Sequence, residues 1–248
     1  MTVGAAGQGD RPVALVTGGG TGIGAACCRA LAAEGFRVGV HYRSSEATGR
    51  ALADALPGSF LLRADLAIPE EIDSLVAELK ERAGRVDVLV NNAGTNVNAP
   101  MLTMKLDDYD AVAAMARGTW YLTKLVLRRF MLRQGGRIIN ISSVVGHTGN
   151  PGQIPYTMVK AALDAFTKSL AQELAGREVA VNSIAPGFID TEMTTELPEE
   201  IRQAILARIP MQRMGRADEV ADAVAWLATR ASYVHGSVVH VNGGMFGG

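Results

Sequence analysis

The chain contains little cysteine, no excess charge of either sign and no long hydrophobic segment. Its 248 residues include two cysteines, the adjacent Cys27 and Cys28. Neighbours on a helix point about 100° apart, which is poor geometry for a disulfide. We therefore expect two small core residues in a reducing compartment. The four histidines show no metal-ligand spacing, so the sequence predicts no metal site.

Charge and hydropathy exclude two broad classes of protein. The formal net charge is -1 at pH 7, which excludes a globally basic nucleic-acid binder. No apolar run approaches the roughly 20 residues that a membrane-spanning helix needs. Residues 1–10 lack the basic and apolar regions of a signal peptide. We expect a disordered tail over residues 1–10 and a single domain over residues 11–248, in a cytoplasmic protein without nucleic-acid or membrane partners.

Strand-like and helix-like segments alternate along the chain. Short apolar runs predict seven strands, at about residues 13–17, 36–42, 59–64, 86–90, 137–142, 179–184 and 237–241. Helical spacing between these runs predicts helices at about residues 23–34, 47–56, 70–83, 107–133, 155–175 and 218–229. This alternation predicts an α/β fold, a doubly wound seven-stranded parallel sheet flanked by helices.

The first predicted strand runs into a glycine-rich turn and then a helix. Its glycines are spaced as Gly18-xxx-Gly22-x-Gly24. Such a turn at a helix N-terminus can bind phosphate, because free N–H groups and the helix dipole face the anion. A tight turn without a ligand would also explain these glycines. The position of the turn at the first strand of an alternating fold favours a dinucleotide.

The end of the second predicted strand indicates which dinucleotide binds. Folds that bind NAD usually place an acid there to hold the ribose 2′-hydroxyl. Here the chain reads His41-Tyr-Arg-Ser-Ser45, with no acid before Glu46. The guanidinium of Arg43 suits a 2′-phosphate, which it can grip through two N–H groups. The sequence therefore predicts NADPH, unless Arg43 is merely a solvated loop charge.

Six motifs then occur in an order and spacing similar to those of one family. They are Thr17-Gly-xxx-Gly-Ile-Gly24, Asp65-Leu66, Asn91-Asn-Ala-Gly94, Ser143, Tyr156-xxx-Lys160 and Pro186-Gly187. The chain resembles the short-chain dehydrogenase/reductases, which have a Rossmann fold. Within that family it most resembles the β-ketoacyl-acyl-carrier-protein reductases, over residues 136–146, 181–190 and 241–245. Related reductases of sugars, steroids and other alcohols share much of the pattern and stay open as alternatives.

The resemblance implies an NADPH-dependent reductase of β-ketoacyl thioesters carried on acyl carrier protein, in fatty acid or polyketide synthesis. It implies a homotetramer or homodimer, and allows a hetero-oligomer with a related reductase. The substrate-contacting residues would be Ser143, His147, Gln153 and Tyr156, although His147 is more often a polar loop residue. The segment at about residues 188–215 resembles the family's mobile substrate lid. The cofactor site would comprise Gly18, Gly20, Thr21, Gly22, Ile23, Gly24, Arg43, Asp65, Leu66, Asn92, Ala93, Gly94, Tyr156, Lys160, Pro186, Gly187, Ile189 and Thr191.

Three residues, Ser143, Tyr156 and Lys160, form the expected catalytic set. Tyr156 and Lys160 are four apart on a predicted helix and therefore share a face. A phenol with a pKa near 10 can protonate the carbonyl oxygen only if that pKa is lowered, which a nearby ammonium favours. Ser143 ends a strand and can donate a hydrogen bond to the same oxygen. Taken singly, these residues also fit as a half-buried aromatic, a surface charge and a turn cap.

The sequence departs from the family at one catalytic position. The family has an Asn on the long helix before the Ser143 strand, where it holds a water that relays protons to the Lys. Here Met115 or Ala116 falls at that place, and neither side chain can bond a water. The helix is also about one residue shorter, which would rotate it by about 100° unless a bulge absorbs the change. The chain is therefore either a working reductase with another relay or a degenerate, non-catalytic partner subunit.

Basic residues near the predicted long helices suggest a partner surface. Arg128, Arg129, Arg133 and Arg177 are expected to form a basic patch beside the entrance of the site. Such a patch could steer an acidic carrier protein, although a solvated helix face explains it equally well. The helices at 107–133 and 155–175 are the family's pairing surfaces.

Overall fold

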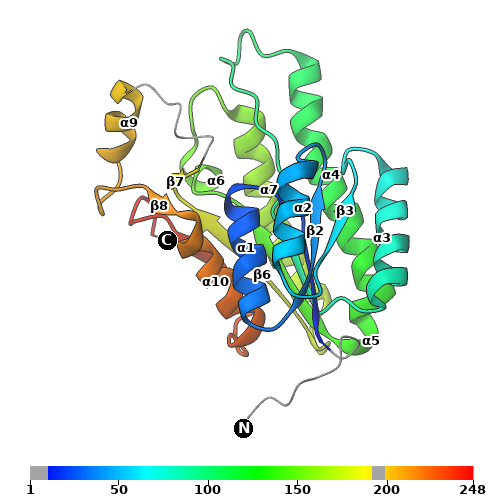
Figure 1. Cartoon of the computed structure of the whole chain (residues 1–248). Helices are drawn as coiled ribbons and strands as arrows, with labels where there is room; N and C mark the ends of the chain where they lie inside the picture. The colour runs from blue at the N-terminus through cyan, green and yellow to red at the C-terminus, as the bar shows by residue number, and fades with distance from the viewer. Residues whose placement is uncertain (1–10, 192–198, 248) are drawn as a thin grey trace.

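The computed structural model describes residues 11–191 and 199–247. Seven strands form one parallel sheet in the order β3-β2-β1-β4-β5-β6-β9 (Figure 1). The sequence prediction of a seven-stranded doubly wound sheet is therefore confirmed. The strands are β1 (Val13–Val16), β2 (Arg37–Tyr42), β3 (Phe60–Arg63), β4 (Val88–Asn91), β5 (Gly136–Ile141), β6 (Val179–Pro186) and β9 (Val238–Val241).

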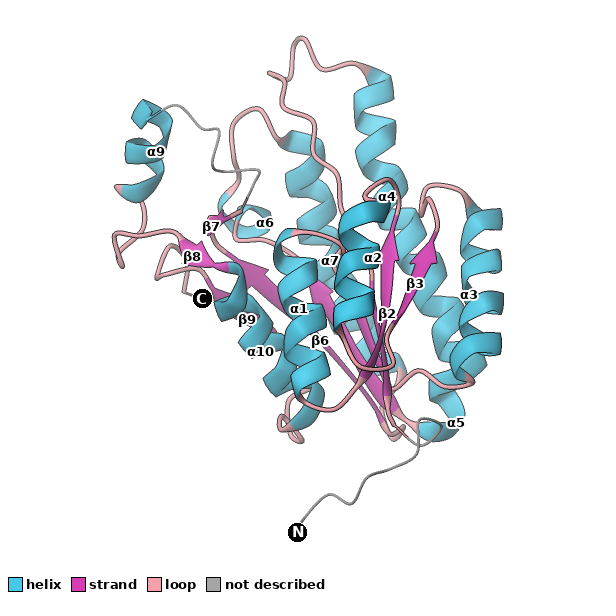
Figure 2. Ribbon diagram, in the orientation of Figure 1, coloured by secondary structure: helices cyan, strands magenta, loops and turns pink. Residues whose placement is uncertain are grey.

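Helices cover both faces of this sheet (Figure 2). The helices α1, α2 and α10 pack on one face, and α3, α4 and α7 pack on the other. The principal helices are α1 (Gly22–Ala33), α2 (Glu46–Ala55), α3 (Pro69–Ala83), α4 (Leu106–Val126), α7 (Ile154–Glu173) and α10 (Ala217–Thr229). The shorter ones are α5 (Leu132–Gln134), α6 (Val145–Thr148) and α9 (Glu199–Leu206). In the part of the chain that is described, no helix is long and apolar enough to cross a bilayer.

The two faces of the sheet bury separate apolar cores. Along β1, Leu15 belongs to the core under α3, α4 and α7, whereas Ala14 and Val16 belong to the core under α1, α2 and α10. The side chains of successive strand residues point to opposite faces, so a strand covered on both sides reads as a continuous apolar run. Cys27 and Cys28 are free, fully buried members of the second core, as the sequence predicts. Burial raises the pKa of the Cys27 thiol to about 12.

Helix α3 illustrates how local sequence sets the ends of an element. Pro69 stands in its first turn, where a missing N–H costs nothing. Glu70 and Glu71 occupy the first turn, which complements the positive end of the helix dipole. Gly84 ends the helix in the left-handed region at φ 70°, a conformation that glycine adopts without strain.

The predicted helix over residues 107–133 is not continuous. Helix α4 ends at Val126, and a π-helical turn spans Leu127–Met131 before α5 begins. A π turn holds more residues than an α turn and so changes which side chains face inward. Here it lets the adjacent Phe130 and Met131 both be buried. This is the kind of bulge that could reset the rotation of the long helix relative to β5.

The segment after β6 contains structure that hydrophobic periodicity does not predict. Ile189–Asp190 form strand β7, which pairs in parallel with strand β8, Gly215–Arg216. These two short strands close the base of the predicted lid, and α9 lies within it (Figure 1). Part of the lid prediction, residues 192–198, lies outside the described residues, as do the predicted tail at 1–10 and residue 248.

Candidate active site

The order of strands reverses between β1 and β4, and this switch point positions the site. In open α/β sheets, ligands bind outside the carboxyl ends of the strands at such a reversal. The glycine loop follows β1, Asn92 follows β4, Ser143 lies two residues after β5, and Pro186 ends β6. The fold therefore brings the principal predicted motifs to one edge of the sheet.

The glycine loop has a backbone that only glycine fits. Gly18 and Gly22 have positive φ values of 62° and 50°, in the region that side chains with a Cβ rarely adopt. A Cβ on Gly24 would collide with the carbonyl of Gly18, so the first turn of α1 packs directly on the loop. Such a close, open backbone fits the pyrophosphate of a dinucleotide.

His41, on β2, supports this loop and is a residue that sequence reasoning missed. Its Nδ1 accepts a hydrogen bond of 3.0 Å from the Gly18 amide, and its Nε2 lies 3.0 Å from the carbonyl of Ala64. Two such contacts require a neutral imidazole that donates from Nε2. Burial is the main cause that lowers the His41 pKa to about 4. The only signal in the sequence is a polar residue inside an apolar strand.

Asn92 also holds the loop, through its side-chain amide. Its Nδ2 donates to the carbonyls of Thr17 and Gly18 at 2.9 and 3.1 Å. The Thr17 hydroxyl in turn accepts from the amides of Asn92 and Ala93 at 2.9 and 3.0 Å. These bonds tie the end of β4 to the glycine loop. Asn92 therefore fixes the loop, and its place beneath the ribose stays a prediction.

The predicted adenine-side residues gather around the ends of β1, β2 and β3. Arg43 is exposed just after β2, free to reach a phosphate from solvent. A Cβ on Gly20 would lie 3.6 Å from the carbonyl of Ser45, so the loop approaches the β2–α2 connection. The carboxylate of Asp65 accepts from the Ala67 amide at 2.9 Å, and Leu66 is buried against α4. Thr21 is the N-cap residue of α1, and Ile23 follows it as a partly buried residue.

The opposite side of the crevice is formed by the segment after β6. The carbonyl of Pro186 accepts a bond of 2.8 Å from the Val144 amide, so this segment supports the turn beyond Ser143. A Cβ on Gly187 would lie 2.8 Å from the Cα of Asn242, which only glycine avoids. The side chain of Thr191 approaches Gly22 in the glycine loop. One of the predicted nicotinamide-side residues therefore meets the glycine loop, and Ile189 is buried at the base of the predicted lid.

Ser143 and Tyr156 place two hydroxyls together. The Oγ of Ser143 accepts from the Val145 amide at 3.3 Å. Burial raises the pKa of Tyr156 above its ordinary value, and the nearby Ser143 hydroxyl opposes that rise. The lowered pKa expected from Lys160 is therefore not found in this structure, because desolvation of the phenolate dominates. The Lys160 ammonium lies 5.4 Å from the centroid of the Tyr156 ring.

Lys160 is almost completely buried. It is 5% exposed, and its Nζ donates to the carbonyl of Ile141 at 2.7 Å. Burial lowers its pKa to about 8, and the nearby carboxylate of Asp164 opposes this shift. The prediction that Tyr156 and Lys160 share a helix face is confirmed, since both lie on α7 against the end of β5.

Met115 is one of the two residues predicted to stand where the family has its Asn. It lines a small cavity of about 10 Å³ together with Gly94, Tyr156 and Lys160, which is about enough for one water. Ala116 does not line this cavity. A larger cavity of about 300 Å³ lies between the base of the lid and the C-terminal segment, lined by residues such as Phe188, Met211 and Asn242.

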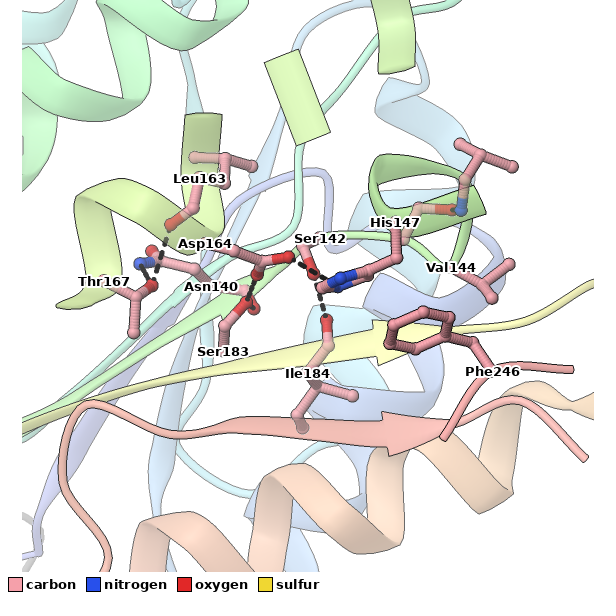
Figure 3. Close-up of polar contacts among 12 residues, drawn as sticks. Asn140, Ser142, Val144, His147, Leu163, Asp164, Thr167, Ser183, Ile184 and Phe246 are labelled. Carbon is pink, nitrogen blue, oxygen red and sulfur yellow. Dashed lines mark hydrogen bonds and ion pairs between the residues drawn. The ribbon is translucent and has the colours of Figure 1, made fainter. Parts of the chain in front are cut away.

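Two predicted substrate residues contact other side chains of the protein. The Nε2 of His147 lies 2.9 Å from the Oδ2 of Asp164, and its ring stacks on Phe246 (Figure 3). The Nε2 of Gln153 donates to the Oδ1 of Asn98 at 2.8 Å. His147 is therefore held inside the protein, and Gln153 bridges two loops at the rim of the site.

The predicted basic patch does not lie beside this site. Arg128, Arg129 and Arg133 directly precede β5, and Arg177 precedes β6. A helix that returns between parallel strands ends at their amino edge, whereas the site lies at the carboxyl edge. All four arginines are exposed there. The expectation that they flank the entrance is wrong within one subunit.

Comparison with known proteins supports the same motifs over nearly the whole chain. A family model described as Enoyl-(Acyl carrier protein) reductase matches residues 18–246. A 3-oxoacyl-[acyl-carrier-protein] reductase FabG of Aquifex aeolicus is 44% identical over 241 residues, which are 94% of this chain and 97% of that protein. The proteins of the same name from Escherichia coli and Staphylococcus aureus are 42% and 38% identical, with the same coverage. The chain therefore belongs to the short-chain dehydrogenase/reductase family.

Proposed function

We propose that this protein reduces β-ketoacyl thioesters on acyl carrier protein to β-hydroxyacyl thioesters, with NADPH as reductant, in fatty acid or polyketide synthesis. The observation that carries the proposal is the meeting of Ser143, Tyr156 and Lys160 at the switch point of the sheet. Relatives named for this reaction are 38% to 44% identical over 94% of the chain, which supports the substrate class.

The residues divide the reaction between them. When bound, NADPH supplies a hydride to the carbonyl carbon. The carbonyl oxygen gains negative charge as a result and must receive a proton. The Tyr156 hydroxyl donates this proton, and the Ser143 hydroxyl donates a hydrogen bond that fixes the same oxygen. The Lys160 ammonium favours the phenolate that remains and holds the nicotinamide ribose. A proton from solvent then restores the phenol.

The choice of NADPH rests on the exposed cation after β2. Arg43 has no neighbouring acid at the strand end, so a 2′-phosphate meets a guanidinium rather than a carboxylate. In titrations of the protein, NADPH binds at least tenfold more tightly than NADH. Equal affinities for the two cofactors would contradict this assignment.

Assembly and location follow from the same family reading. Apolar side chains are exposed on α4 and α7, among them Trp120 and Met158, each 50% exposed. Exposed apolar patches of this kind favour association with a second copy, and we infer a homodimer or homotetramer in the cytoplasm, with a related reductase as an alternative partner. Light scattering of the purified protein gives the assembly directly.

The test is NADPH oxidation followed by absorbance with a short β-ketoacyl thioester. Turnover in the wild type that falls at least about 10³-fold in Tyr156→Phe, with NADPH affinity kept within about threefold, supports the proposal. Variant activity equal to the wild type would remove Tyr156 as the acid. A panel of sugar, steroid and simple ketones separates the reductase of another alcohol from the thioester reductase. Bound NADPH without turnover of any substrate would favour a non-catalytic partner subunit.

A further inference from the structure

A cluster of buried polar side chains lies directly behind the catalytic residues. This Asp164 cluster comprises Asp164 and Thr167 of α7, His147 of α6, Asn140 of β5 and Ser183 of β6 (Figure 3). The carboxylate of Asp164 is 5% exposed. Its Oδ1 accepts from the Ser183 hydroxyl at 2.5 Å, and its Oδ2 lies 2.9 Å from the Nε2 of His147. Both oxygens therefore have a partner on a different element.

Aromatic contacts hold His147 against this carboxylate. Its ring stacks on Phe246 with centroids 4.8 Å apart and meets His240 edge-on at 4.9 Å. His147 lies four residues after Ser143, on the turn that packs against α7 at Lys160 and Ala161 through Gly146. The pair thus joins the C-terminal segment, the Ser143 turn and α7 at one point.

Asp164 lies one helical turn beyond Lys160 on the buried face of α7. Lys160 reaches the carbonyl of Ile141, while the Ser183 hydroxyl also lies 3.1 Å from the carbonyl of the preceding residue, Asn140. Lys160 therefore contacts β5 directly at Ile141, whereas Asp164 is linked to the neighbouring residue Asn140 through Ser183. Opposite charges at this spacing on a helix attract each other, and burial strengthens the attraction because little water screens it.

We propose that Asp164 is a positioning residue for the reaction, fixed by His147 and Ser183 so that its negative charge opposes the charge of Lys160 from inside the protein. The inference rests on the proposed function, because it assigns Asp164 a role through Lys160. Asp164 touches neither substrate nor cofactor. It gives the buried ammonium a permanent counter-charge behind the site, independent of what occupies the crevice in front.

The other ionisable groups around Asp164 fix the sign of the effect. Lys160 faces it from α7, His147 faces it from α6, and His240 faces it from β9. Tyr156 lies one turn before Lys160 on the same helix. The strands β5 and β6 contribute the neutral Asn140 and Ser183. Burial lowers the pKa of Lys160 to about 8, and the charge of Asp164 opposes this fall. Without the carboxylate, Lys160 should lose its proton at lower pH.

Asp164→Asn removes the charge while leaving the contacts possible. Its amide oxygen can accept from His147, and its amide nitrogen can donate to Ser183, whose own proton then goes to the carbonyl of Asn140. We expect the alkaline loss of NADPH affinity and of kcat to move about one pH unit lower than in the wild type. At pH 8 this is about a fivefold loss of turnover, and near pH 6.5 the two proteins are nearly equal.

The controls are Ser183→Ala and His147→Gln, which keep the carboxylate. Both are expected to lower the melting temperature without moving the alkaline limb, because neither substitution removes the charge of Asp164. If Asp164→Asn does not fold, the double variant His147→Gln/Asp164→Asn replaces the pair by two amides and is measured in the same way.

The outcomes separate this inference from the proposed function. Three results would overturn the role of Asp164. The alkaline loss of NADPH affinity and turnover could be the same in Asp164→Asn as in the wild type, or it could move equally in Ser183→Ala. NADPH binding by the wild type could also show no alkaline loss at all. A shifted limb in NADPH binding, in a protein that reduces no β-ketoacyl thioester, supports Asp164 and contradicts the proposed reaction instead.

Discussion

The two halves of the site are held by different kinds of interaction. Around the glycine loop, the partners are backbone groups and neutral side chains, such as the Gly18 amide on His41 and the Asn92 amide on Thr17. Around α7, the partners are buried ionisable groups, Lys160 and Asp164. The first half fixes a shape that a phosphate can enter, and the second half fixes a distribution of charge.

This difference decides how each half should respond to change. A shape made by close backbone contacts fails when one extra carbon is added, at any pH, because no side chain can move aside. A charge distribution fails gradually and as a function of pH, since each group can gain or lose a proton. The most informative experiments therefore test whether the response of each half to a substitution depends on pH.

The largest effect is expected for Gly24→Ala in the loop half. Its Cβ would overlap the carbonyl of Gly18, and a collision with backbone cannot be relieved by a rotamer change. We expect NADPH affinity to fall at least 100-fold. The free energy of unfolding should fall by about 1–3 kcal/mol or more, which lowers the melting temperature by several degrees. Cofactor titration and thermal melts at pH 6.5 and 8 should give the same loss at both values.

Gly20→Ala is the matched control for this substitution. A Cβ at this position would have no neighbour closer than 3.6 Å, so the melting temperature should stay within about 2 °C of the wild type. A Gly24→Ala variant that melts and binds NADPH like the wild type would show that the loop can yield, against the shape argument.

The sequence predicted the elements and motifs of the loop half well, because close packing there leaves glycine as the only fitting residue. Gly18, Gly22 and Gly24 are recognisable from spacing alone, and the structure has them at positive φ or at a backbone contact. Tyr156 and Lys160 were also found, since their spacing of four places them on one face of a helix.

The sequence did not reveal the contacts that join distant segments. Nothing in the spacing of His147 and Asp164 indicates that they meet, since α6 and α7 come together only through the fold. His41 was missed because a single histidine in a strand carries no pattern. The basic patch was misplaced because its arginines precede β5 and β6, and segments that lead into parallel strands lie at the amino edge of the sheet.

A smaller effect is expected from His41, a buried ionisable group in the loop half. The His41 pKa of about 4 in the folded protein lies below the ordinary 6.5. As the pH falls, His41 is therefore protonated in the unfolded chain before it is protonated in the folded protein. Its contribution to the free energy of unfolding is complete above pH 6.5 and is lost as the pH falls towards 4. In urea titrations, the free energy of unfolding should fall between pH 7 and 4.5 in both proteins. The fall should be about 2 kcal/mol smaller in His41→Asn than in the wild type.

The His41→Asn variant should also be less stable than the wild type at pH 7, where the bonds to Gly18 and Ala64 are missing. Identical pH dependence in the two proteins would mean that His41 titrates normally, and the loop half would then contain no pH-sensitive element at all.

The smallest effect is expected where the catalytic half lacks a polar residue. Met115→Asn puts an amide at the wall of the small cavity beside Lys160, where it can bond a single water. If reprotonation limits a working reductase, turnover should rise about two- to threefold, despite about 1–3 kcal/mol lost from burying the amide. Ala116→Asn, about 100° around the helix, should leave turnover unchanged. An equal rise of turnover in both variants would show that the gain does not depend on this cavity. If neither variant turns over substrate while NADPH still binds, the non-catalytic subunit is favoured.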